Sequence, residues 1–100
     1  MTFSVALDRD ADGDVALVLA WLDEFAPEQA DRFLDDLAAT LTAIGRHAML
    51  RPELIAGSRR GSMRRFPYHV WYFVLPEIRH AEVFAVLHFR RGPDALGDRL

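Results

Sequence analysis

Residues 68–75 read Tyr-His-Val-Trp-Tyr-Phe-Val-Leu, and residues 81–89 read Ala-Glu-Val-Phe-Ala-Val-Leu-His-Phe. Both runs are dominated by β-branched and aromatic residues, which favour extended backbone. The connection between them, Pro76–His80, is short and begins with a proline. Two such runs joined by a short connection predict an antiparallel hairpin, with Tyr68–Leu75 as a central strand of the sheet.

Upstream of this hairpin, the pattern predicts one short strand and two helices. Residues 2–8 alternate apolar and polar side chains, which is typical of a half-buried strand. Apolar residues at helical spacing then predict a helix over about Asp12–Phe25, with Asp10–Asp14 supplying its cap and a negative first turn. A second helix is expected from Pro27 to a C-cap at Gly45, antiparallel to the first.

An irregular connector, residues 46–62, precedes the hairpin and is rich in Arg, Gly, Ser and Pro. A short strand is expected at Met63–Phe66. Gly92-Pro93 ends the last strand, and the tail Asp94–Leu100 is expected to form a helical turn or to fray. One domain over residues 1–100 follows from the length. The predicted fold class is α+β, in the order β-α-α-β-β-β, with a helical hairpin packed on one face of a small, mostly antiparallel sheet.

The predicted sheet carries more apolar surface than two helices can cover. In the central strand, one face receives Val70, Tyr72 and Val74, and the other receives Trp71, Phe73 and Leu75. The last strand repeats this pattern, with Val83, Ala85, Leu87 and Phe89 against Phe84 and Val86. The second face therefore needs either a partner protein or the chain's own connector and tail, and the amount of apolar surface favours a partner.

The charges are distributed unevenly, although the net charge is only −3. Residues 1–45 carry ten acidic residues and two arginines, whereas residues 46–65 carry six arginines and one acid. All twelve basic residues are arginine, which excludes chemistry that needs a lysine amine. The absence of cysteine excludes disulfides and fits a cytoplasmic protein. No membrane segment or signal peptide is expected, because no apolar run is long enough and the N-terminus lacks a basic region.

Three sequence motifs occur in a defined order along the chain. They are Pro-Glu-Gln-Ala-Asp-Arg-Phe at residues 27–33, Arg-Arg-Phe-Pro-Tyr-His-Val-Trp-Tyr-Phe-Val at residues 64–74, and Val-Phe-Ala-Val-Leu-His-Phe-Arg-Arg-Gly-Pro at residues 83–93. In this order and at this spacing they resemble the ParE/RelE superfamily. The resemblance covers nearly the whole chain, and Met63–Arg91 carries most of it. It implies the fold described above and the role of toxin in a type II toxin–antitoxin system.

The resemblance also implies a partner. This is a cognate antitoxin, ParD-like or similar, which neutralises the toxin by direct binding in a hetero-oligomeric complex. Such antitoxins usually pair a DNA-binding N-terminal part with a C-terminal segment that wraps the toxin. The second sheet face and the basic residues 46–65 offer surfaces for that segment. No metal or other cofactor is expected, because His47, His69 and His80 lack metal-ligand spacing.

Two target classes are open within the superfamily. ParE-like members resemble DNA gyrase poisons, and RelE-like members resemble endonucleases that cut mRNA on the ribosome. An RNase needs an acid, a base and cations around the scissile phosphate. This chain has no lysine, and Phe89 follows His88 where some RNase members have tyrosine. The sequence favours the non-enzymatic ParE-like branch; in the RNase alternative, His88, Arg90 and Arg64 form a minimal site.

The candidate binding residues for a target or an antitoxin lie around the hairpin: Arg64, Arg65, Trp71, Phe73, His88, Arg90 and Arg91. Simpler roles are open for most of them. His88 can be a structural hydrogen-bonding residue rather than a target contact or an acid–base group. Trp71 and Phe73 fit the core or an antitoxin interface better than a platform for stacked bases. Arg90-Arg91 can be either a solvated strand end or a functional basic pair.

Overall fold

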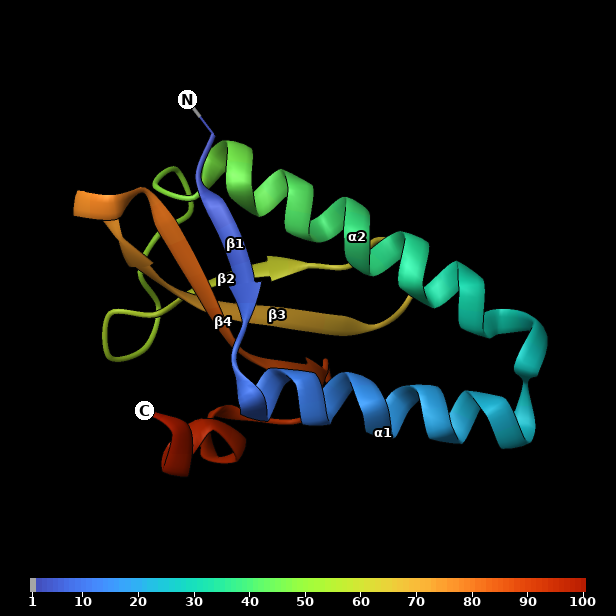
Figure 1. The fold of residues 1–100 in the computed structure, drawn as a ribbon. Coiled ribbons are helices and arrows are strands. Elements are labelled where there is room, and N and C mark those ends of the chain that lie inside the picture. The colour runs from blue at the N-terminus through green and yellow to red at the C-terminus, as the bar shows by residue number, and fades with distance from the viewer. Residues whose placement is uncertain (1) are drawn as a thin grey trace.

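A four-stranded sheet with a helical hairpin on one face makes up the protein (Figure 1). The computed structural model describes residues 2–100. In chain order its elements are β1 (Ser4–Leu7), α1 (Arg9–Phe25), η1 (Pro27–Gln29), α2 (Ala30–His47), β2 (Arg59–Ser62), β3 (Tyr68–Leu75), η2 (Pro76–Ile78), β4 (His80–His88) and η3 (Pro93–Arg99), where η marks 3-10 helix. The strand order is β1-β4-β3-β2, with β1 parallel to β4 and the other pairs antiparallel. The predicted α+β class, element order and mostly antiparallel sheet are confirmed.

The first helix begins at Arg9, earlier than the predicted Asp12, because Asp8 is its cap. Asp8 has extended backbone, and its Oδ1 accepts a hydrogen bond from the backbone N–H of Ala11 at 2.9 Å. This bond satisfies one of the donors that a helix start leaves free. The predicted role of Asp14 as a first-turn surface charge is wrong, since its side chain is buried.

The second helix runs through Gly45 to His47, so the predicted C-cap at Gly45 is wrong. The glycine is needed for a close approach between α2 and the start of β1. Its carbonyl accepts the backbone N–H of Phe3 at 2.8 Å, and a Cβ added to it would lie 2.9 Å from the carbonyl oxygen of Phe3. A side chain here would push β1 away from the helix.

The edge strand β2 occupies Arg59–Ser62, inside the predicted connector, and the predicted strand at Met63–Phe66 is wrong. Residues 64–67 form a bend instead. Three successive backbone N–H groups in this bend point at the Asp36 carboxylate on α2, so they cannot join a strand ladder. The Asp36 side chain of α2 therefore stabilises the turn between β2 and β3.

The hairpin β3–β4 matches its prediction closely but contains a bulge that the sequence did not reveal. Trp71 pairs with Ala85 and Tyr72 pairs with Val83, so Phe84 has no cross-strand partner. An extra residue shifts the alternation of every later side chain to the opposite face. The residues packed in the helix-side core are accordingly Ala81, Val83 and Val86, and those on the second face are Phe84, Ala85 and Leu87. The predicted grouping of Ala85 and Leu87 with Val83 is wrong for this reason.

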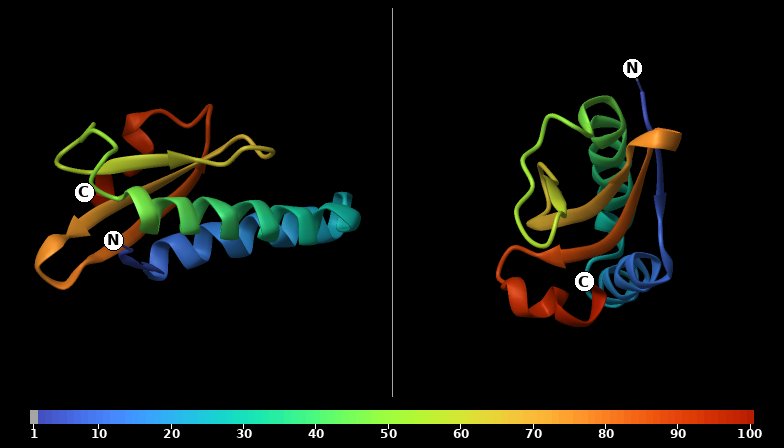
Figure 2. Two further views of the ribbon diagram at one scale, coloured as in Figure 1. Left: turned by 90° about the horizontal axis from the view of Figure 1, so that it is seen from above. Right: turned by 90° about the vertical axis from the view of Figure 1, so that its left-hand side faces the viewer.

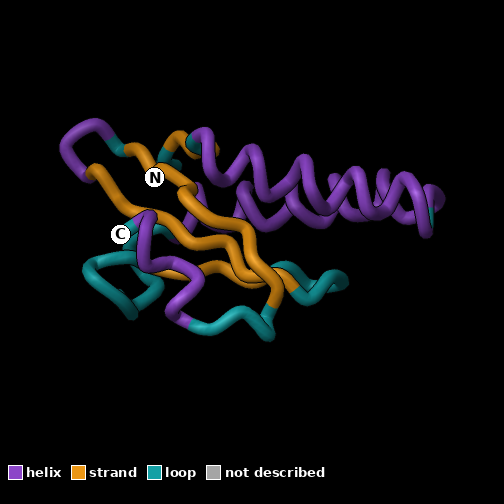
Figure 3. Tube along the Cα trace, turned by 90° about the horizontal axis from the view of Figure 1, so that it is seen from below, coloured by secondary structure: helices purple, strands orange, loops and turns teal. Residues whose placement is uncertain are grey.

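The second face of the sheet is covered in large part by the chain itself. Leu96 of η3 is buried against Trp71 and Phe84, and Ile55 from the connector packs at the edge of the same cluster. Figure 3 shows the tail and the connector lying beside the strands. The expectation that a partner covers most of this face is therefore wrong, and the alternative of self-cover by connector and tail is correct. The tail forms a 3-10 helix rather than fraying.

The helical hairpin extends past the end of the sheet, as the left panel of Figure 2 shows. Three large apolar side chains on α1 are exposed: Leu17, Trp21 and Phe25, at 73%, 60% and 64%. Within residues 2–100, no helix combines the length and the hydropathy that crossing a membrane requires.

Candidate functional site

An apolar groove lies between α1 and the ends of β3 and β4. Its larger cavity has a volume of about 470 Å³ and is lined by Val18, Trp21, Leu22, Phe66, Pro67, Tyr68 and His88. A second cavity of about 230 Å³ adjoins it and adds Asp14, Leu17, Val86, Leu87 and Arg91 to the lining. We call these two cavities together the α1 groove. Two of the exposed apolar side chains of α1, Leu17 and Trp21, line it.

Aromatic side chains lie on both walls of the α1 groove. On the α1 side Trp21 lines the groove, and the ring of Phe25, one turn further along α1 and outside the lining, lies 5.2 Å from the Trp21 ring; both side chains are largely exposed. On the opposite wall, the rings of Tyr68 and His88 meet edge to face at 5.4 Å. Burial raises the pKa of Tyr68, so its hydroxyl stays protonated near neutral pH. The groove can therefore accept an apolar segment whose polar side faces Tyr68 and His88.

A second candidate site, the aromatic–basic cleft, lies on the second face of the sheet. It has a volume of about 310 Å³ and is lined by Leu54, Ile55, Arg60, His69, Trp71, Phe89, Arg91, Gly92 and Pro93. The His69 and Phe89 rings are stacked at 4.2 Å, and the guanidinium carbon of Arg60 lies 5.4 Å from the centroid of the Trp71 ring. Planar aromatic faces next to two arginines suit a flat, anionic ligand.

His69 is the titratable group of the aromatic–basic cleft. Burial, and after it the nearby positive charge of Arg60, lower its pKa below 6.5, so the ring is neutral at pH 7. Its Nδ1 lies 2.8 Å from the hydroxyl oxygen of Ser62, which fixes the orientation of the ring. A neutral, oriented imidazole beside arginines can accept a proton.

The bend that carries Arg64 and Arg65 is held by Asp36. Its Oδ1 accepts the backbone N–H of Arg64 at 3.1 Å, and its Oδ2 accepts those of Arg65 and Phe66 at 2.8 and 3.0 Å. Burial by itself would raise the pKa of Asp36, but the three backbone donors and the Arg65 charge outweigh it and lower the pKa. The carboxylate therefore stays ionised and fixes the backbone positions of Arg64 and Arg65.

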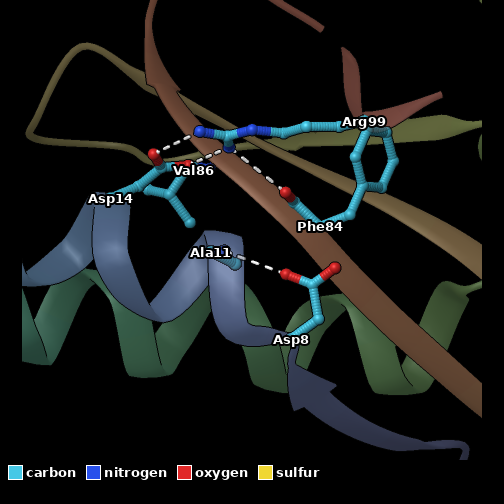
Figure 4. A network of polar contacts seen from close by, with 6 residues as sticks. All are labelled: Asp8, Ala11, Asp14, Phe84, Val86 and Arg99. Atoms are coloured by element: carbon cyan, nitrogen blue, oxygen red, sulfur yellow. Dashed lines mark hydrogen bonds and ion pairs between the residues drawn. The ribbon is translucent and has the colours of Figure 1, made fainter.

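The tail is attached by a buried ion pair between Asp14 and Arg99 (Figure 4). Arg99 donates to both carboxylate oxygens of Asp14, with 2.9 Å between Nη2 and Oδ1, and also to the carbonyl of Phe84 at 3.2 Å. Asp14 Oδ2 accepts the backbone N–H of Val86 at 2.9 Å. The hydrogen bond to Asp14 is the main cause that raises the pKa of Arg99. The ion pair thus provides hydrogen-bond partners for the Phe84 carbonyl and the Val86 N–H of β4, beyond Val83, where the pairing with β1 ends.

The predicted site residues are divided among these places. His88 lines the α1 groove, and its Nδ1 accepts the backbone N–H of Arg90 at 3.1 Å. Arg91 lines both the α1 groove and the aromatic–basic cleft. Arg64 and Arg65 lie at the α2 side of the fold, and neither lines the α1 groove that contains His88.

Trp71 and Phe73 lie on the second face of the sheet, where Trp71 is buried and Phe73 stacks on Phe84 at 4.7 Å. Sequence reasoning missed Arg60 and His69 as neighbours of Trp71. The cross-strand register explains their meeting, since Arg60 pairs with Trp71 and Ser62 with His69. Placing β2 at Arg59–Ser62 in the sequence analysis would have predicted that Arg60 and His69 lie beside Trp71.

The sequence matches no family model and no curated protein. The fold does match solved structures. The chain is similar to one in the "Chromosomal ParDE TA system from P. aeruginosa", with a TM-score of 0.71, 18% identity, and coverage of 87% of this chain and 96% of that one. It is also similar to one in the toxin–antitoxin complex RelBE2 from Mycobacterium tuberculosis, with a TM-score of 0.53, 21% identity, and coverage of 88% and 99%. The chain therefore has the fold that ParE and RelE structures share.

Proposed function

We propose that this chain is the toxin of a type II toxin–antitoxin system, that it belongs to the ParE-like branch of the ParE/RelE superfamily, and that it inhibits DNA gyrase. The observation that carries the proposal is the fold likeness to a chain of a ParDE system, which spans most of both chains at a TM-score of 0.71. The motifs in residues 27–33, 64–74 and 83–93 support it independently of the fold. The site of action would be the cytoplasm, where gyrase works.

The antitoxin surface in this proposal is the α1 groove. Leu17, Trp21 and Phe25 are exposed together on one side of α1, and clustered aromatic side chains of this kind are typical of protein interfaces. Burying each of them would contribute about 1.5–3 kcal/mol before the costs of association. An amphipathic segment of the antitoxin, with its apolar side toward α1, fits this surface.

The target surface in this proposal includes the arginines at the end of β4. Arg90 and Arg91 follow the end of β4 after one intervening residue, Phe89, and both are exposed. Inhibition by binding needs no general acid or base on the toxin. The lack of lysine and of a tyrosine after His88, which argues against nuclease chemistry, is compatible with this mode.

One observation favours a RelE-like mRNA endonuclease as the second candidate. The aromatic–basic cleft combines a neutral His69 with Arg60 and Arg91, which together could take a proton from a 2′-hydroxyl and stabilise a phosphorane. Phe89 and Trp71 would hold the flanking bases. In this candidate the chemistry lies around His69 rather than around His88.

Expression followed by two biochemical assays tests the proposal. Induction should arrest growth, and co-expression of the neighbouring gene should restore it. The purified chain should then block supercoiling by purified gyrase, while primer extension on cellular mRNA shows no new cleavage at codon sites. The RelE-like proposal replaces the ParE-like one if gyrase is unaffected at high toxin excess and if the chain causes cleavage at codon sites that His69→Ala abolishes. If induction does not arrest growth, the chain is a binding module without toxicity.

A further inference from the structure

A cavity of about 300 Å³ lies between α2 and the β2 edge, away from both the α1 groove and the aromatic–basic cleft. It is lined by Asp36, Ala39, Thr40, Ala43, Arg51, Ser62 and Arg64. The two alanines open the α2 side of the cavity, because longer side chains at these positions would fill it. Its charged groups are two arginines and one carboxylate.

The carboxylate in this cavity is already engaged. Asp36 accepts backbone N–H groups with both of its oxygens, so much of its charge is compensated inside the bend 64–66. The guanidinium groups of Arg51 and Arg64 have no comparable acceptor: no hydrogen bond or ion pair of either side chain is present within residues 2–100. The cavity therefore has an unmatched excess of positive charge.

Arg51 is held in position by its neighbours. Arg59 Nη1 donates to the backbone carbonyl of Arg51 and, at 3.3 Å, to that of Met49. Arg59 Nη2 lies 3.6 Å from Glu53 Oε1. The Arg51 side chain lies against β2, where a Cβ added to Gly61 would stand at an ordinary contact distance of 3.7 Å from Arg51 Nε. Arg59 thus holds the backbone at Arg51, and the Arg51 side chain lines the cavity.

The Arg51 side chain carries an unsatisfied donor. Among residues 2–100, Arg51 Nε is the buried side-chain nitrogen without a hydrogen-bond partner. Leaving such a donor unpaired costs about 1–3 kcal/mol. A small rotation of the guanidinium would turn the Nε–H toward the cavity, where an anion could accept it. Guanidinium groups bind phosphate oxygens by two parallel hydrogen bonds, which is the arrangement that would use this donor.

We propose that the cavity between α2 and β2 binds a phosphate-type oxyanion, with Arg51 as the principal ligand and Arg64 as the second. A neighbouring cavity of about 410 Å³ is lined by Arg32, Asp35, Asp36, Ala39, Arg64 and Arg65, so it shares Arg64 and leaves room for the remainder of a phosphate ester. The ligand is therefore either free phosphate or the terminal phosphate of a small ester such as a nucleoside monophosphate. The site is independent of whether gyrase or the ribosome is the target.

The test is titration of the full-length chain with inorganic phosphate and with adenosine monophosphate at constant ionic strength. Binding is followed by calorimetry and by amide shifts in two-dimensional NMR spectra. Saturable binding should shift the amides of Gly61, Ser62 and Arg64. Arg51→Ala should weaken it about tenfold or more, because one bidentate charge-assisted contact is lost. Arg51→Lys should not restore it, since lysine lacks the planar fork.

Arg46→Ala is the matched control, because it removes the same charge from an exposed position outside the cavity. It should leave the affinity within about twofold, as expected for screened charges. Tighter binding of the monophosphate than of phosphate assigns the ester as the ligand, and the reverse assigns the free ion. The proposal is wrong if neither probe binds, if Arg46→Ala weakens binding as much as Arg51→Ala, or if the shifts appear around His69 and Arg91 instead.

Discussion

Asp14→Ala should destabilise the protein more than any other change of a charged residue on α1. The substitution leaves Arg99 without its carboxylate and the Val86 N–H without its acceptor. Asp14 is only 8% exposed, so water cannot fully replace these bonds. Breaking a buried pair by removing one partner costs about 3–5 kcal/mol. For a domain of this size, each kcal/mol lowers the midpoint of thermal unfolding by about 4–8 °C.

The loss should begin at the tail. Without the ion pair, η3 is held mainly by Leu96, so the tail should detach and expose the Trp71 cluster. Urea unfolding gives the stability change, and limited proteolysis with dye binding reports whether the tail has opened. Asp12→Ala is the control, an exposed acid on the same helix whose loss costs about 0.3–1 kcal/mol through the helix dipole. Equal losses for the two variants, or an Asp14→Ala protein whose tail resists protease, would refute this account.

Three further predictions concern single positions. Because the pKa of Asp36 is lowered in the folded state, its contribution to stability is present above about pH 4 and is lost as the pH falls through the folded-state pKa. Urea unfolding measured at a series of pH values should show this loss in the unmodified chain and not in Asp36→Asn. Gly45→Ala should destabilise, because its Cβ would meet the Phe3 carbonyl oxygen at 2.9 Å, whereas Gly13→Ala on α1, with open space around it, should stabilise by about 0.5–1 kcal/mol in thermal unfolding. Trp21→Ser should weaken co-purification with the product of the neighbouring gene at unchanged thermal stability, while Leu50→Ser, at a position that is also exposed but lies outside the α1 groove, should leave it intact.

The helices and the central hairpin were predictable because each has a strong local signal. Tyr68–Leu75 is a continuous run of strand-forming residues bounded by proline on both sides, and the structure places β3 at those residues. The stripes on the two helices repeat at helical spacing. Such patterns depend on the residue and its close neighbours in sequence, so no knowledge of the tertiary structure is needed.

Features set by distant contacts were not predictable in the same way. β2 reads Arg-Arg-Gly-Ser and has no apolar alternation; it is a strand because β3 offers it an edge. Gly45 looks like a helix end in sequence, yet it is required by the approach of β1. Asp14 and Asp36 look like surface acids on helices, and only their partners 72 and 28 residues away in sequence show that they are structural.

The bulge at Phe84 links these unpredicted features to the candidate sites. It shifts the alternation in β4, which places Leu87 on the second face and Val86 toward α1. The backbone groups beside the bulge, the Phe84 carbonyl and the Val86 N–H, are bound by Arg99 and Asp14, so α1 and the tail are fixed to β4 at this point. One wall of the α1 groove and the cover of the second face therefore depend on the same extra residue. Since a one-residue slip exchanges the two faces of a strand, deleting Phe84 should disrupt the second-face cluster, in which its ring packs, and also the α1 groove, which it does not line.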